Sequence, residues 1–292
     1  MDPVRSVDPD TLPYRISLEA ANRTVGLIAF ALPLALLAVT ALGIGCQSIE
    51  SLSDYYFTPL GGDLFSGALM IIGAVMLFFY SLPKRPRGGV IDVSHYRGHT
   101  KSDFRLARLA GAMAFVVALF PASGPGCEDL GGGVARAFIT EAQGGAGQAI
   151  TGAVSMDFLS TIGQGQSWLS WLHYGAAAVM FLVLAFYSYV VFTRVQTVDG
   201  TAAPVIEKGT RKWMRNTLYR ACGIVIVIAM VALALSLVIA DPDSPNWWDR
   251  ANLTFWFESL ALFAFGLSWS VKGRVLPILR DRDEDNPRKT LK

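Results

Sequence analysis

Charged side chains are scarce in this chain of 292 residues: Asp, Glu, Lys and Arg make up 16% of it, against roughly 25% in soluble domains. The net charge of +2 is too small to indicate a nucleic-acid partner. With 3 Cys and 3 His scattered along the chain, there is no zinc framework of the CxxC…CxxC kind. P-loops, GxSxG elbows and HExxH helices are also missing. No motif therefore names a cofactor, a metal or a reaction.

Hydrophobic residues make up 52% of the sequence, and they gather in six long runs. The runs cover about 25–44, 64–82, 106–122, 171–193, 218–240 and 253–271. Each approaches the roughly 20 residues that a membrane-spanning helix needs, and a lipid environment satisfies backbone hydrogen bonds only within helices or closed barrels. We expect an all-α bundle of six transmembrane helices over 24–274, with polar tails at 1–23 and 275–292.

The basic residues predict the orientation of this bundle. Of the 25 Lys and Arg, all except Arg136 and Arg250 fall in the tails and in the loops on the same side as the tails. Basic residues concentrate in cytoplasmic loops, so both termini are expected in the cytoplasm of a bacterial inner-membrane protein. The tryptophans agree with this orientation, with five at the outer boundary and two, Trp213 and Trp269, near the inner one.

Two cysteines fall on the predicted outer side. Cys46 follows the first run, and Cys127 begins a long outer loop, 124–170, that is rich in Gly, Ala, Gln and Ser. The outer compartment favours oxidation, so a Cys46–Cys127 disulfide is one interpretation, and two free thiols are the other. Cys222 lies inside an apolar run and is expected to pack in the core.

Three ionisable residues are predicted at one depth near the outer boundary: Asp63, His173 and Glu258. A carboxylate at the depth of Glu258 is costly unless it is paired or protonated. One His and two carboxylates can bind a divalent metal or shuttle a proton, so the three are candidate catalytic residues of an outward-facing pocket. The predicted lining of this pocket consists of Ser53, Tyr55 and Tyr56. The alternatives are a helix N-terminal role for Asp63, an interfacial role for His173 and a structural hydrogen bond for Glu258.

A basic cluster marks the predicted inner start of the fifth helix. It consists of Arg211, Lys212, Arg215 and Arg220. The cluster serves as a topology signal and can also contact anionic lipid headgroups. Membrane lipid is therefore the one partner that the sequence predicts.

Four stretches of the sequence are similar to stretches of known proteins. They are SLSDYYFTPLGGDLFSGAL from residue 51, ALFP from 118, RNTLYRACG from 215 and WFESLALFAFGLSWSVKG from 256. The chain resembles a group of uncharacterised six-helix bacterial membrane proteins with S-x-S-x-Y-Y in the first outer loop. It is more distantly similar to the superfamily of alkaline ceramidases and progestin/adiponectin receptors, which use a Ser, an Asp and three His around zinc. Here His173 is the one intramembrane histidine, and the helix with paired histidines is absent.

We expect a protein that binds a lipid or small amphiphile, or senses the envelope, through the outer pocket. The alternative is a membrane-embedded, metal-dependent hydrolase that uses Asp63, His173 and Glu258. A small proton-coupled transporter ranks third, because the sequence shows no internal repeat, and Pro33 is the only proline in the middle of a predicted helix.

Overall fold

The computed structural model describes residues 18–43, 51–80, 100–120, 167–194, 208–239 and 247–279. Cys46 and Cys127 lie outside these ranges, and so does the predicted outer loop apart from its last residues. Within the described ranges every regular element is a helix, with no strand. The predicted all-α class is confirmed.

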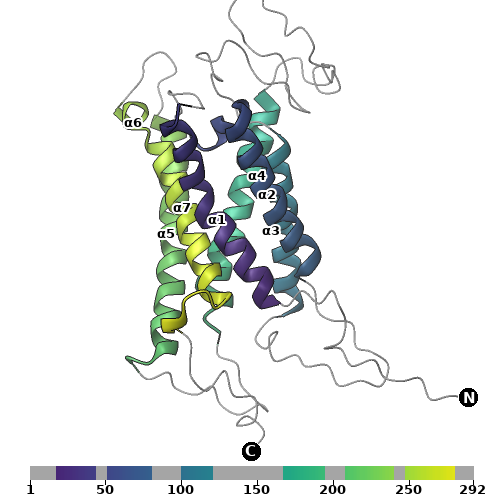
Figure 1. The fold of residues 1–292 in the computed structure, drawn as a ribbon, viewed down its shortest axis with the longest axis vertical. Helices are drawn as coiled ribbons and strands as arrows, with labels where there is room; N and C mark the ends of the chain where they lie inside the picture. Colours follow the sequence, from purple (N-terminus) through teal and green to yellow (C-terminus); the bar gives the residue numbers. More distant parts are fainter. Residues whose placement is uncertain are drawn as a thin grey trace, which may run out of the picture.

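Six long helices stand roughly side by side (Figure 1). They are α1 (Leu18–Ala41), α2 (Pro59–Ala74), α3 (Lys101–Leu119), α4 (Ser167–Phe186), α5 (Arg211–Ile239) and α7 (Leu253–Lys272). Two π-helical turns extend α2 and α4, namely η3 (Val75–Phe79) and η6 (Tyr187–Val191). The short elements are η2 (Ser53–Phe57), α6 (Trp247–Arg250) and η7 (Pro277–Leu279). We call the end that carries η2 and α6 the upper end and the end that carries η7 the lower end, as drawn in Figure 1.

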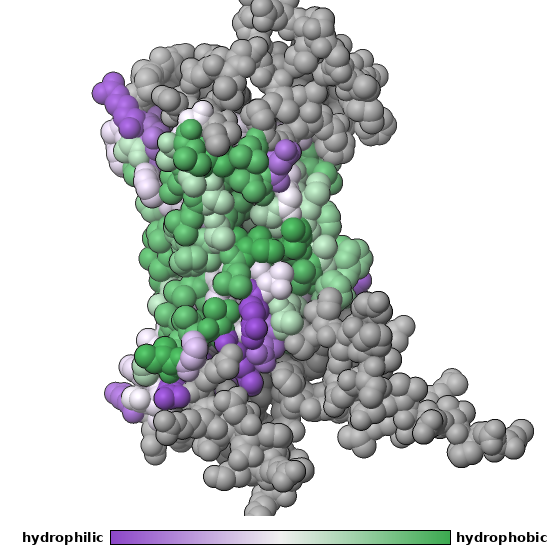
Figure 2. Space-filling model, in the orientation of Figure 1, coloured by the Kyte–Doolittle hydropathy of each residue, from purple (hydrophilic) through white to green (hydrophobic). Residues whose placement is uncertain are grey.

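Five of these helical segments are long and apolar enough to cross a membrane: 18–41, 60–79, 171–191, 211–236 and 253–272. The α3 helix is outside this set and carries four charged residues in its first half. Figure 2 shows a hydrophobic band around the middle of the visible face, with hydrophilic residues toward both ends. This pattern is typical of a multi-pass membrane protein.

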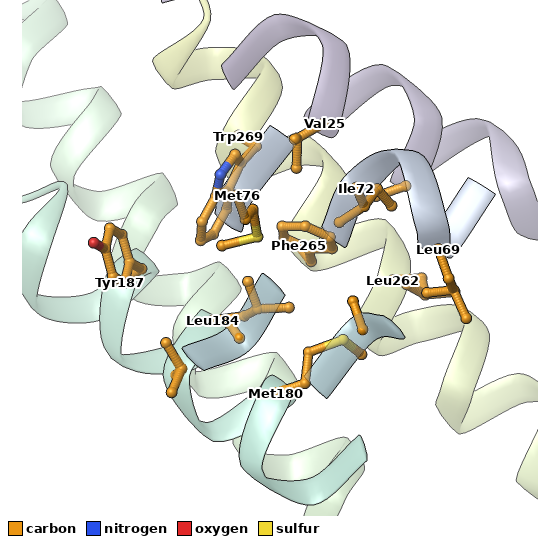
Figure 3. Packing of buried hydrophobic residues seen from close by; sticks show 14 of the residues in the cluster. Val25, Leu69, Ile72, Met76, Met180, Leu184, Tyr187, Leu262, Phe265 and Trp269 are labelled. Atoms are coloured by element: carbon orange, nitrogen blue, oxygen red, sulfur yellow. The ribbon is translucent and has the colours of Figure 1, made fainter. Parts of the chain in front are cut away.

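The helices form a closed ring in which each one packs against two neighbours, in the order α1, α2, α3, α4, α5, α7 and back to α1. Buried side chains from opposite sides of the ring fill its centre. Figure 3 shows Ile72 and Met76, from α2 and η3, near Phe265 and Trp269 of α7, with Leu184 of α4 close by. The ring is therefore a packed core in this region.

Glycines allow two pairs of helices to approach closely. A Cβ added at Gly266 of α7 would lie 2.5 Å from the backbone nitrogen of Phe30 in α1, and one at Gly73 of α2 would lie 2.9 Å from the carbonyl oxygen of Gly111 in α3. Small residues are typical of close contacts between spanning helices, and Gly73 and Gly111 form such a contact. Gly67 of α2 does not, because a Cβ there would meet nothing within 4 Å.

A buried polar contact closes the lower end of the core. The Tyr80 hydroxyl donates to Asn22 Oδ1 of α1 and accepts from Trp269 Nε1 at 2.8 Å. Trp269 is fully buried, with the Phe192 ring 4.6 Å from its own, centroid to centroid. Trp269 therefore packs inside the bundle near its lower end, whereas Trp213 is 38% exposed.

A second polar contact joins α3 to the end of α4. Asp103 forms a capping box with Thr100 at the start of α3, in which the Asp103 N–H donates to Thr100 Oγ1 at 3.2 Å and the Thr100 N–H donates to Asp103 Oδ2. Thr100 Oγ1 also donates to Asp103 Oδ2 at 2.9 Å. The same carboxylate is ion-paired with Arg194, which follows η6. Burial raises the pKa of the Asp103 carboxyl, but the hydrogen bonds from Thr100 and Arg194 outweigh burial and hold its pKa below the ordinary value.

Candidate functional site at the upper end

Residues 51–58 fold back on themselves before α2 begins. The Ser51 backbone N–H donates to Asp54 Oδ2 at 2.9 Å, and the Asp54 N–H donates to Ser51 Oγ at 3.2 Å. The hydroxyls of Ser51 and Ser53 lie 2.8 Å apart and share a hydrogen bond. At the other end, Thr58 Oγ1 donates to the Tyr55 carbonyl, and Pro59 provides a first helical residue that needs no N–H partner. We call this unit segment 51–58.

Hydrogen bonds join segment 51–58 to three different helices. The Tyr55 hydroxyl is hydrogen-bonded to Thr40 Oγ1 of α1 at 2.6 Å. The Tyr56 hydroxyl donates to the Leu119 carbonyl at the end of α3 at 3.0 Å, where helix geometry leaves the last carbonyls without a partner. The Leu52 N–H donates to Glu258 Oε2 of α7 at 2.6 Å. One short segment thus joins α1, α3 and α7 at the upper end.

Tyr55 is the largest fully buried side chain of the segment, with 1% of its surface exposed. A Cβ added at Gly61 would lie 2.5 Å from the Tyr55 ring, so only glycine leaves room for this ring. Burial raises the pKa of the Tyr55 hydroxyl, against the opposing effect of the Thr40 hydrogen bond. Tyr55 therefore stays protonated near neutral pH.

Glu258 lies in the second turn of α7, on the side that faces segment 51–58. Its carboxylate accepts from the Leu52 N–H and interacts with the backbone of Ser53, and Asp54 is its nearest acidic neighbour. No Lys or Arg in the described ranges forms an ion pair with Glu258. Two carboxylates therefore lie at one short segment, and backbone N–H groups donate to both of them.

Aromatic side chains surround this position on α6 and α7. The Tyr55 ring lies 6.5 Å from that of Phe255, and Trp248 stacks on Phe257 with centroids 5.3 Å apart. Trp247 and Trp256 are more than half exposed, in the position expected of tryptophans at a membrane boundary.

His173 occupies a buried position near the start of α4. Its Nδ1 lies 2.7 Å from the Phe120 carbonyl oxygen just after α3, and because a carbonyl only accepts, Nδ1 carries the proton. The ring also meets Tyr174 edge-on. His173 thus joins α4 to α3.

Asp63 lies in the second turn of α2 with its side chain exposed. Within the described part of the chain, no group of three or more His, Cys, Asp and Glu is arranged to hold a metal ion. Of the three ionisable residues predicted to act together, the structure brings Glu258 to segment 51–58. It gives His173 a different partner and leaves Asp63 at the surface.

Three groups at this end were missed by sequence reasoning: Thr40, the Leu119 carbonyl and the Phe120 carbonyl. Two of them are backbone atoms, which carry no residue signature. Thr40 is a single hydroxyl within an apolar run, and that is the one signal that the sequence offered for it.

Comparison of the chain with protein-family models, curated proteins and solved structures gives no match. The function of this chain is therefore inferred from its own residues and contacts.

Proposed function

We propose that this chain is a six-span protein of a bacterial inner membrane, with both termini in the cytoplasm, that binds a lipid or small amphiphile at its outer end and so reports on the envelope. The binding site in this proposal consists of segment 51–58 and Glu258. The sixth span is α3, whose charges lie in the half next to the cytoplasm. The basic residues support this orientation, because the exposed ones at the start of α3 and α5 share the lower end.

One observation carries the proposal: Glu258 accepts hydrogen bonds from backbone N–H groups and pairs with no cation in the described ranges. A carboxylate in a membrane-spanning helix is costly, and such residues tend to be functional. A carboxylate is also a strong acceptor for a head group that carries N–H or O–H donors. The aromatic residues beside it, including Trp248 and Phe257, suit the apolar part of the same molecule.

Segment 51–58 supplies a means of response. Hydrogen bonds attach it to α1, α3 and α7, and the attachment to α7 is the one made to a carboxylate. A head group that competes for Glu258 would weaken the attachment to α7 and leave those to α1 and α3 in place. Binding would then change how the upper ends of these helices are held together.

The test compares Glu258→Gln with the wild type. The Gln carbonyl still accepts from the Leu52 N–H, so the fold of the segment is kept while the negative charge is lost. We expect an amphiphile that co-purifies with the wild type, quantified by mass spectrometry of extracted lipid, to fall about tenfold or more in Glu258→Gln, as for loss of a charged hydrogen bond. Unchanged lipid content in Glu258→Gln would contradict the proposal.

Asp63→Asn is the matched control, because it removes an exposed carboxylate at the same end. The amphiphile-binding proposal predicts wild-type lipid content in this variant. A metal-dependent hydrolase that uses Asp63, His173 and Glu258 predicts instead that both variants lose activity together and that purified protein contains metal.

A further inference from the structure

The exposed face of α5 is a continuous apolar stripe. Its members recur at helical spacing and are exposed by 43% to 55%: Ile224, Val227, Ile228, Val231 and Leu235. An exposed apolar stripe on a helix long enough to span a membrane suits contact with the hydrocarbon chains of lipid.

The polar start of α5 continues the same stripe. Arg220 lies four residues before Ile224, and Trp213 lies seven residues before Arg220, so at 100° per residue the three fall within about 40° of one another around the helix. Thr217 lies between them on the same face. The side chains of Trp213, Thr217 and Arg220 are exposed.

Arg220 is therefore a cation at the edge of a lipid-facing surface. Ile224 and the apolar stripe begin one turn above it, whereas Trp213 lies two turns below, roughly 10 Å along the axis. That distance covers the headgroup layer, which accounts for roughly 5–8 Å of a bilayer on each side. Arg220 forms no ion pair with any residue of the described ranges.

We infer that Trp213, Thr217 and Arg220 bind the phosphate of a phospholipid in the leaflet at the lower end. The guanidinium matches two phosphate oxygens with two parallel N–H donors, and the Thr217 hydroxyl adds a third donor one turn away. The indole of Trp213 has the apolar body and polar edge that suit the headgroup layer. The acyl chains of the bound lipid lie along Ile224 and the stripe above it.

The short element η7 (Pro277–Leu279), which we call the strap, supports this depth for the membrane surface. Arg215 Nη1 donates to the Leu279 carbonyl of η7 at 3.0 Å, which holds the strap against α5. The strap exposes Ile278 by 74%. Figure 2 shows hydrophobic and hydrophilic residues next to each other at the lower end of the visible face. An isoleucine this exposed, on a strap at the lower end, suits contact with the bilayer surface better than with water.

The charges around Arg220 determine which phospholipid the proposed site prefers. Partly exposed Lys212 adds to the positive potential beside Arg220. Of the described acids at the lower end, Glu19 pairs with Arg23 and Arg274, and Asp103 pairs with Arg194. An anionic phospholipid such as phosphatidylglycerol is therefore favoured over a zwitterionic one. The inference rests on the helices crossing a bilayer and is independent of Glu258.

The test is native mass spectrometry of the full chain in detergent, titrated with phosphatidylglycerol. We expect Arg220→Gln to weaken binding of this lipid roughly fivefold, the effect of one basic residue near an anionic surface. Arg250→Gln, which removes an exposed cation at the upper end, should bind like the wild type. Equal affinity of the Arg220→Gln and Arg250→Gln proteins would overturn the inference.

Two further measurements define the ligand and separate this site from the upper one. Inorganic phosphate at millimolar concentration should leave lipid binding unchanged, and displacement of the lipid by phosphate would assign the site to the free ion and overturn the inference. Arg220→Lys keeps the charge but loses the paired donors, so we expect an affinity between those of the wild type and Arg220→Gln. Glu258→Gln should leave the phosphatidylglycerol affinity unchanged, so either proposal can fail alone.

Discussion

Replacing Asp103 by Ala should weaken the attachment of α3 to the end of α4 and lower the stability of the fold. The substitution removes the half of the capping box in which the Thr100 N–H donates to the Asp103 carboxylate, and it leaves Arg194 without this carboxylate. The other half, in which the residue 103 backbone N–H donates to Thr100 Oγ1, remains. Loss of the hydrogen bond to the carboxylate costs about 1 kcal/mol. The Arg194 side chain is 30% exposed, so solvent screens the ion pair, and its loss should cost about 1–2 kcal/mol rather than the 3–5 kcal/mol of a fully buried pair.

The sum, about 2–3 kcal/mol, corresponds to a fall of roughly 5–10 °C in the unfolding midpoint of a protein of this size. Thermal unfolding in detergent, followed by tryptophan fluorescence, measures it. Lys101→Ala changes an exposed residue of the same turn and should leave the midpoint unaltered. Adding Arg194→Gln to Asp103→Ala should cost little more, because the pair is already broken. A midpoint within about 1 °C of the wild type for Asp103→Ala would refute the reasoning.

Three further outcomes are expected in the same unfolding assay. Gly266→Ala should destabilise the fold, because the new Cβ meets the α1 backbone, whereas Gly67→Ala, which meets open space, should be neutral or stabilising by up to about 1 kcal/mol; the opposite order would contradict the packing. Tyr80→Phe should cost about 1–3 kcal/mol, because it leaves a buried amide oxygen without a donor, and Tyr189→Phe at an exposed position should cost almost nothing. Folding lowers the pKa of the Asp103 carboxyl, so its contribution to the free energy of unfolding should be full above about pH 4 and should disappear as the pH falls through the lowered pKa. Asp103→Asn should remove this part of the pH dependence of stability. An unaltered acid profile in that variant would contradict the prediction.

The helices were predictable because a bilayer leaves the backbone few choices. Long apolar runs must be helical when water is absent, so composition alone indicates the all-α class. Which face of each helix meets a neighbour is a tertiary matter that composition does not encode. Gly67 and Gly73 look alike in the sequence, but only Gly73 lies against another helix. The burial of Trp269 is likewise a tertiary property, because it depends on contacts with Tyr80 and Phe192 from other parts of the chain.

The candidate site was only partly predictable. Shared depth placed Glu258 and segment 51–58 in the same region, although more than two hundred residues separate Leu52 from Glu258. The atoms that engage the side chains are largely backbone groups, such as the Leu52 N–H and the Phe120 carbonyl. Any residue can supply these atoms, so no motif marks them, and only the fold shows that Glu258 and His173 have different partners.

The orientation of the bundle underlies both proposals, and single-cysteine labelling of intact cells tests it most directly. In a background with Cys46, Cys127 and Cys222 replaced by Ser, Arg250→Cys and Lys208→Cys place one thiol at each end of the bundle, both at exposed positions. A membrane-impermeant maleimide should label Arg250→Cys in intact cells and Lys208→Cys only after the cells are permeabilised. Labelling of Lys208→Cys in intact cells, with Arg250→Cys protected, would contradict the account.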